Sequence, residues 1–171
     1  MDPFSTLGIP ATFDVDLSVA ERIHRDLSRA LHPDRYVGAS VSERRIALAK
    51  AVEVNEAWRT VRDPIRRAEA LLALRGVSVG DGASQVSLSP AFLMQMIELR
   101  EALADARAPG DAGAVHTLAS DVEARARRSE GELSCGFKDG KGSELLTPLA
   151  ELRFYRRFLD EVGAIEDDFA I

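Results

Sequence analysis

The chain has 171 residues but only one cysteine, Cys135, and three histidines. A single cysteine excludes an intramolecular disulfide, so we expect a reducing compartment. His24, His32 and His116 are scattered through the sequence and form no cluster with Cys135 at the spacing of zinc ligands. We therefore expect neither a bound metal nor any other cofactor.

Three other kinds of segment are also missing. No apolar run reaches the roughly eighteen residues that a membrane-spanning helix needs, and the N-terminus does not begin with a charged and then apolar leader. No glycine-rich loop of the type that cradles a nucleotide phosphate is present either. These absences predict a cytoplasmic protein with no membrane partner and no ATP hydrolysis of its own.

The charge is acidic overall and unevenly distributed. With 46% hydrophobic and 29% charged residues the composition is that of a folded globular protein, and a net charge of −6 argues against nucleic-acid binding. Residues 1–77 carry 12 Lys or Arg against 11 Asp or Glu, whereas residues 78–171 carry 10 against 17. Together with a Gly- and Ser-containing stretch, this change predicts a first domain at 1–77, a linker at 78–88 and a second domain at 89–171.

Capping patterns predict four helices in the first domain. The start signals are Asp2-Pro3, the capping boxes Ser18-Val19-Ala20-Glu21 and Ser40-Val41-Ser42-Glu43, and Asp63-Pro64, with Gly8 and Gly76 as stops. The two longer helices each carry an apolar face, formed by Ala20, Ile23, Leu27, Ala30 and Leu31 in one and by Ala47, Ala51, Val54, Trp58 and Val61 in the other. This pattern predicts an antiparallel helical hairpin, with Trp58 as the central anchor of the core.

The tripeptide His32-Pro33-Asp34 falls at the bend between these two helices. Pro33 fixes its own φ and biases His32 away from the α region, so the first helix stops there and the bend is stiff. Arg22, Arg25 and Arg29 recur at helical spacing and form a basic stripe on a separate face of the preceding helix. Taken alone, such a stripe is a solvated helix face more often than a binding surface.

The second domain reads as three helices with short connections. They are expected from Ser89 to about Ala108, from about Ala112 to Leu133, and from a start between Ser143 and Pro148 to about Val162, with a turn region at Gly136–Gly142 that leaves Cys135 in a loop. Short connections favour an antiparallel three-helix bundle. The predicted fold class is therefore all-α, with a helical hairpin domain followed by this bundle.

The helix that begins at Ser89 has two apolar faces. The residues Phe92, Met96, Leu99, Leu103 and Ala106 fall within about 80° of one another and suit the bundle core. Leu93, Met94 and Ile97 form a second sector, which Glu98 and Glu101 border. A surface helix of a three-helix bundle does not need a second apolar face, so this one meets either a partner protein or the first domain.

The last helix has one aromatic residue outside its core face. That face is formed by Leu152, Tyr155, Phe158, Leu159 and Val162. Phe154 lies about 100° from its centre. A lone exposed aromatic often has no function, but beside a second exposed apolar sector it is a candidate binding hot spot.

The bend between two amphipathic helices resembles a J domain, whose invariant tripeptide is His-Pro-Asp. A wider resemblance, to the HscB family of iron–sulfur cluster co-chaperones, covers nearly the whole chain. It rests on Met1-Asp2 with Phe4, Leu7-Gly8-Ile9-Pro10, His32-Pro33-Asp34-Arg35, Val54-Asn55-Glu56-Ala57-Trp58, Arg66-Arg67-Ala68-Glu69-Ala70-Leu71-Leu72, Phe92-Leu93-Met94, Glu98-Leu99-Arg100-Glu101 and Leu152-Arg153-Phe154. The zinc-binding cysteine extension of some eukaryotic relatives is absent, and Arg35 stands where many J domains have Lys.

The resemblance implies a co-chaperone with two partners. J domains stimulate the ATPase of heat-shock chaperones, here of the HscA or DnaK class, which implicates His32, Pro33 and Asp34, with the arginine stripe steering the encounter. In the HscB family the C-terminal bundle binds the cluster scaffold IscU, which implicates Leu93, Met94, Ile97, Glu98, Glu101 and Phe154.

Two alternatives stay open at this stage. An enzyme that used His32 and Asp34 would need convergent partners in a cleft, which an exposed bend does not offer. A general J-domain co-chaperone for another client normally carries a Gly/Phe-rich linker or a cysteine-rich zinc module, and neither is present here.

Overall fold

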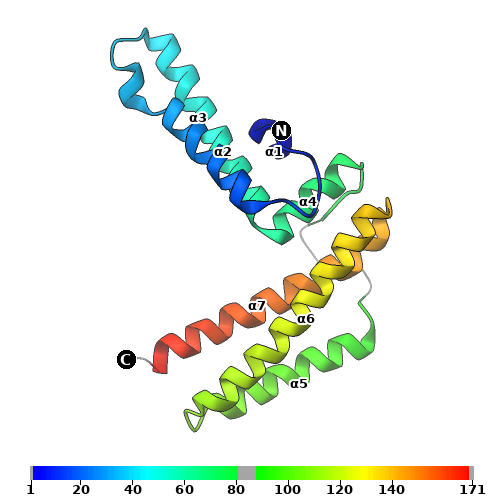
Figure 1. Cartoon of the computed structure of the whole chain (residues 1–171). Coiled ribbons are helices and arrows are strands. Elements are labelled where there is room, and N and C mark those ends of the chain that lie inside the picture. The colour runs from blue at the N-terminus through cyan, green and yellow to red at the C-terminus, as the bar shows by residue number, and fades with distance from the viewer. Residues whose placement is uncertain (1, 81–87, 170–171) are drawn as a thin grey trace. The chain divides into compact units, whose positions relative to one another are not determined.

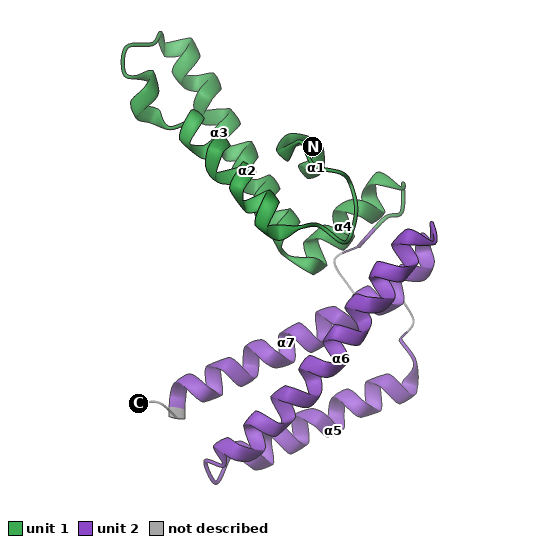
Figure 2. Cartoon of the chain, in the orientation of Figure 1, with its two compact units in different colours: residues 1–78 green, residues 79–171 purple. Residues whose placement is uncertain are grey.

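The computed structural model describes residues 2–80 and 88–169. By its internal contacts the chain divides into two compact units, residues 1–78 and 79–171, which Figure 2 colours separately. Every regular element within the described ranges is helical, so the prediction of an all-α fold is confirmed. No helix in those ranges combines the length and the apolarity needed to cross a bilayer.

The first unit is built around an antiparallel hairpin of α2 and α3 (Figure 1). Its elements are α1 (Pro3–Leu7), α2 (Leu17–Ala30), η1 (Pro33–Tyr36), α3 (Val41–Arg62) and α4 (Pro64–Leu74). The most completely buried side chains come from all four α-helices and include Phe4, Leu7, Ala20, Val61, Ala68 and Leu72. The core therefore lies where the short helices pack on α3, and the end of the hairpin that carries η1 projects beyond it.

The start of α2 differs from the prediction. Asp16, not Ser18, is the N-cap, and its Oδ1 accepts hydrogen bonds from the N–H groups of Ser18 and Val19 at 3.0 and 3.1 Å. The Ser18 hydroxyl donates to the same oxygen at 2.6 Å. A carboxylate both accepts these bonds and interacts favourably with the positive end of the helix dipole, so the earlier residue starts the helix. The capping box predicted at Ser18 is therefore wrong, whereas the one at Ser40 is confirmed.

Trp58 is not the central anchor of the core. It is half-buried, and its ring stacks on that of His24 with centroids 5.5 Å apart and an interplanar angle of 15°. Ala30, expected on the inner face of α2, is exposed. Ala30 is exposed because α1 and α4 pack at the other end of the hairpin, and Trp58 is half-buried because its ring faces His24 on α2.

The second unit is the predicted antiparallel three-helix bundle of α5 (Pro90–Arg107), α6 (Ala112–Lys138) and α7 (Leu146–Phe169), with the short η2 (Ser143–Leu145) before α7 (Figure 2). Its core holds the five residues predicted for α5 together with Val115, Val122, Tyr155, Phe158, Val162 and Ile165. Leu88, which the sequence analysis assigns to the linker, is also buried in this core. The linker residues 81–87 lie outside the described residues.

Two helices of the bundle extend further toward the C-terminus than predicted. Helix α6 continues past Leu133 to Lys138, so the turn begins after Gly136 and Cys135 is an exposed helical residue instead of a loop residue. A Cβ at position 136 would overlap the side chain of Leu145, so this glycine permits close packing and does not end the helix. Helix α7 likewise runs beyond Val162 to Phe169, with Pro148 in its first turn as expected.

Candidate interaction surfaces

The His32-Pro33-Asp34 bend is exposed and held by its own hydrogen bonds. His32 is the N-cap of η1, and its Nδ1 accepts a hydrogen bond from the N–H of Asp34 at 3.3 Å. The Asp34 carboxylate lies 3.5 Å from the same nitrogen. Because Pro33 occupies the first helical position, its missing N–H leaves no donor unsatisfied. The bend therefore presents an imidazole and a carboxylate whose positions are held by hydrogen bonds between residues close in sequence.

The capping box at the start of α3 stiffens the far side of the bend. The backbone N–H of Ser40 donates to Glu43 Oε2 at 2.8 Å, and the N–H of Glu43 donates to the Ser40 hydroxyl at 3.2 Å. The hydrogen bonds from Ser40 lower the pKa of Glu43. Both ends of the connection between α2 and α3 are thus anchored by side chains.

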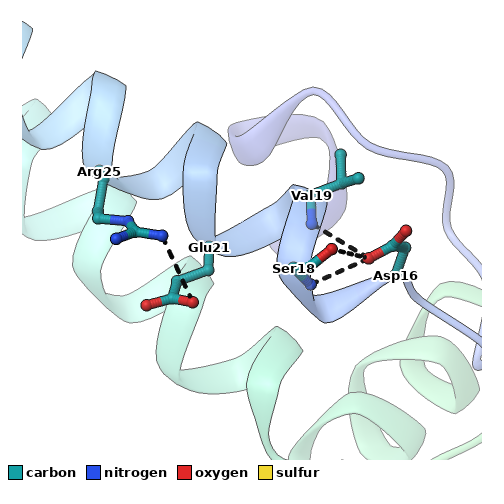
Figure 3. Close-up of polar contacts among 5 residues, drawn as sticks. All are labelled: Asp16, Ser18, Val19, Glu21 and Arg25. Atoms are coloured by element: carbon teal, nitrogen blue, oxygen red, sulfur yellow. Dashed lines mark hydrogen bonds and ion pairs between the residues drawn. The ribbon is translucent and has the colours of Figure 1, made fainter.

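The three arginines predicted as a stripe on α2 are all exposed, but two of them have acidic neighbours on the same helix. Figure 3 shows Arg25 reaching Glu21 at 3.7 Å, with the Asp16 cap one turn further toward the N-terminus. Arg29 lies 3.8 Å from Asp26. Arg22 forms no ion pair with another residue in the described part of the chain, but its charge acts on the carboxylate of the Asp16 cap and helps to lower the pKa of Asp16.

The hairpin is aligned by a contact that the sequence analysis missed. His24 on α2 stacks on Trp58, and its Nε2 lies 3.0 Å from Asn55 Oδ1 and 3.3 Å from the Ser28 hydroxyl. His24, for which the sequence indicated no structural role, therefore connects α2 to α3 through one ring contact and one hydrogen bond. The contact fixes the rotation of α2 about its axis and thus the direction of its arginines.

On α5 the second apolar sector is exposed. Leu93, Met94 and Ile97 are 43%, 57% and 52% accessible, while every residue assigned to the first sector is buried. Glu98 and Glu101 are exposed beside them. The separation of the two faces expected from helical periodicity is therefore present, and three large aliphatic side chains lie together on the surface of the bundle.

Phe154 lies between core and surface. It is half-buried, and its ring meets the ring of Phe92 edge to face at 5.8 Å. Phe92 meets Tyr155 in the same manner at 5.7 Å. Aromatic pairs at such angles and distances are favourable beyond the area they bury. Phe154 is therefore held in a defined orientation, more buried than the sequence predicted.

A polar groove of about 380 Å³ lies where α5, α6 and α7 meet, and the sequence analysis did not find it. Its lining includes Arg128, Ser129, Glu132, Glu151 and Tyr155. Burial, together with the nearby Glu132, raises the pKa of Glu151, while a hydrogen bond with Ser129 opposes this shift. Within the described residues, no three His, Cys, Asp or Glu side chains converge in a way that could hold a metal ion.

Comparison with known proteins finds a matching family profile and similar sequences. The family profile described as the HSCB C-terminal oligomerisation domain matches residues 88–163, which is most of the three-helix bundle. The co-chaperone protein HscB homolog of Ralstonia nicotianae is 40% identical over 141 residues, covering 82% of this chain and 79% of that protein. The corresponding protein of Burkholderia multivorans is 35% identical over 161 residues, covering 94% and 91%.

Solved structures agree over nearly the whole chain. The chaperone HscB from Vibrio cholerae superposes with a TM-score of 0.88 at 31% identity and covers 99% of both chains. The human co-chaperone protein HscB gives a TM-score of 0.90 over 97% of this chain and 82% of its own, and at 23% identity it shows the shared fold alone. With the sequence relatives and the two-unit fold together, the chain belongs to the HscB family of co-chaperones.

Proposed function

We propose that this protein is a co-chaperone of iron–sulfur cluster assembly that carries two docking surfaces and no chemistry of its own. The first unit stimulates the ATPase of a heat-shock chaperone of the HscA or DnaK class. The second unit binds an IscU-type cluster scaffold and delivers it to that chaperone. Each of the two binding functions is thus assigned to one of the two compact units of the chain.

The chaperone-binding surface consists of the bend and the arginine stripe. His32, Pro33 and Asp34 are exposed on a stiff connection, where a partner can reach them without unfolding any part of the chain. Arg22, Arg25 and Arg29 add positive charge, which accelerates the encounter with an acidic surface. In this proposal the Asp34 carboxylate pairs with a positively charged side chain of the chaperone. His32 orients the bend and does not transfer protons.

The scaffold-binding surface consists of Leu93, Met94 and Ile97 on α5 together with Phe154 on α7. The observation that carries the proposal is that these three aliphatic side chains are exposed. A different face of α5 packs into the core of the bundle, so the core does not need them. Apolar side chains stabilise a fold only when they are removed from water, so these exposed side chains do not stabilise the bundle. An exposed apolar patch of this kind marks a site where a partner binds. Glu98 and Glu101 provide the polar rim of this interface.

The proposal is tested by titrating the purified protein into the chaperone and measuring steady-state phosphate release. Wild-type protein should stimulate hydrolysis, and His32→Gln should not, while its helical circular dichroism stays unchanged. The protein alone should release no phosphate. Isothermal titration calorimetry with the scaffold should detect binding by wild type and by His32→Gln alike. Full stimulation by His32→Gln would refute the role of the bend, and the absence of any scaffold binding would refute the role of the bundle.

A further inference from the structure

Helix α3 exposes a stripe of large aliphatic side chains on the side away from its core. Val41, Leu48 and Val52 are 74%, 61% and 55% accessible. At about 100° per residue they fall within a sector of about 40°, and at about 1.5 Å per residue they extend over about 16 Å. The buried residues of α3, such as Val54 and Val61, lie on the opposite side of the helix. The fold therefore does not require this stripe to be apolar.

The stripe is confined to the half of α3 that adjoins the His-Pro-Asp bend. Val41 is the first residue of α3, and Val37, in the connection from η1, is also exposed. Beyond Val52 the same line along the helix continues with Glu56 and Arg59, which form an ion pair with each other. The apolar surface thus begins at the bend and ends about halfway along α3, so it is continuous with the proposed chaperone-binding surface.

The charges around the stripe point to an acidic partner. Arg44 and Arg45 lie on either side of it, and neither forms an ion pair with another residue that the structure describes. Residues 22–52 contain seven Lys or Arg against three Asp or Glu, in a chain whose net charge is −6. A surface complementary to this one has an apolar strip bordered by carboxylates. A scaffold-binding role is disfavoured because that role already has an apolar patch on the other unit, bordered by Glu98 and Glu101.

We propose that the chaperone ATPase docks along the Val41, Leu48 and Val52 stripe as well as on the bend, so that the two form one continuous surface. This inference rests on the proposed function, because it needs the ATPase to be the partner of the first unit. The bend provides the groups that trigger hydrolysis. The stripe provides apolar burial and therefore affinity, and it selects ATPases that carry a matching apolar strip over those that carry a polar one.

The test compares variants of the full-length protein in a titration of chaperone ATPase activity. Leu48→Gln combined with Val52→Gln removes the apolar surface and keeps helix propensity, since Gln is about as favourable as Leu in a helix and more so than Val. Ile46→Gln is the matched control, because Ile46 is 60% accessible on the same helix but lies about 140° around the helix from the centre of the stripe. Val41→Ser is a second stripe variant, to be used if the double variant loses helicity.

The double variant should need about tenfold more protein, or more, for half-maximal stimulation, because two aliphatic side chains no longer leave water on binding. Its maximal stimulation at saturation should equal that of wild type, and Ile46→Gln should titrate as wild type does. A wild-type curve from the double variant, or equal weakening by Ile46→Gln, would overturn the inference. Failure of the wild-type protein itself to stimulate would instead remove the proposed function, and with it the basis of the inference.

Discussion

Phe92 and Phe154 meet edge to face, with an angle of 77° between the ring planes, and so connect the core of the bundle to its exposed apolar patch. Phe92 is buried in the core, whereas Phe154 is only partly covered and lies on a different helix. A side chain already held in one orientation loses little conformational freedom when a partner covers it. Phe154 is therefore suited to be a rigid anchor of the scaffold-binding surface.

Replacing this anchor and its aliphatic neighbour should weaken scaffold binding. We expect Leu93→Ala with Phe154→Ala to cost about 2–4 kcal/mol of binding free energy, the size of hot-spot losses, when measured by titration calorimetry. Leu74→Ala is the matched control, since Leu74 is 51% accessible on α4 of the other unit and should leave affinity unchanged. Thermal unfolding of the double variant separates lost binding from the lost packing on Phe92. Unchanged affinity would exclude this patch as the scaffold surface.

The ion pairs on α2 predict that removing an acid strengthens chaperone binding. Glu21 partly neutralises Arg25, so Glu21→Gln should lower the concentration for half-maximal ATPase stimulation several-fold, while Arg25→Gln should raise it. Both effects should shrink as the salt concentration increases, because exposed charges are screened. The measurement is a set of ATPase titrations at several ionic strengths. Identical, salt-independent curves for the two variants would mean that this stripe does not face the chaperone.

At neutral pH the ionised form of Glu151 should lower the free energy of unfolding of the bundle. Burial, reinforced by Glu132, raises the pKa of Glu151 above its ordinary value of 4.5, so the folded state binds a proton more readily than the unfolded state. The stability of the wild-type protein should therefore fall as pH rises through the window between 4.5 and the raised pKa. Glu151→Gln should be more stable than wild type at pH 7 and equally stable below about pH 4. Urea unfolding at both pH values checks this, and equal stability at pH 7 would contradict it.

Two glycines of α6 should respond in opposite directions to alanine. Gly131 has open space where a Cβ would stand, whereas a Cβ on Gly136 would overlap the buried side chain of Leu145. Gly131→Ala should raise the free energy of unfolding by about 0.5–1 kcal/mol through helix propensity. Gly136→Ala should lower it, because overpacking costs about 1–3 kcal/mol and exceeds the same propensity gain. Chemical unfolding of both variants gives the comparison, and equal stabilisation would mean that η2 does not pack closely on α6.

Periodicity predicted the parts of this structure that depend on local sequence. The buried and the exposed face of α5 consist of the predicted residues. Ser40, Asp63 and Ser89 are the N-caps of α3, α4 and α5, where helices were predicted to start. These features follow from side-chain spacing and from hydrogen bonds between residues a few positions apart. They can therefore be read without knowing the tertiary structure.

The wrong predictions concern features that tertiary packing decides. A glycine near the end of an amphipathic pattern predicted the end of α6, but Gly136 is there because Leu145, from the next element, packs against it. Trp58 was predicted as the anchor because it belongs to the apolar face of the second hairpin helix, whereas its place depends on His24 from the other helix of the hairpin. The N-cap of α2, Asp16, lies two residues before the predicted cap, Ser18, and the backbone conformation that selects Asp16 does not follow from the residue types alone.

The central claim, two separable docking surfaces on one chain, is tested most directly by measuring chaperone ATPase activity with and without scaffold for three proteins. Wild-type protein should stimulate alone and stimulate further when scaffold is added. His32→Gln should do neither, although it still binds scaffold. Leu93→Ala with Phe154→Ala should retain the stimulation seen without scaffold and lose the increment that scaffold adds. If both variants lost the same two activities together, the two surfaces would not be separate and the account would be contradicted.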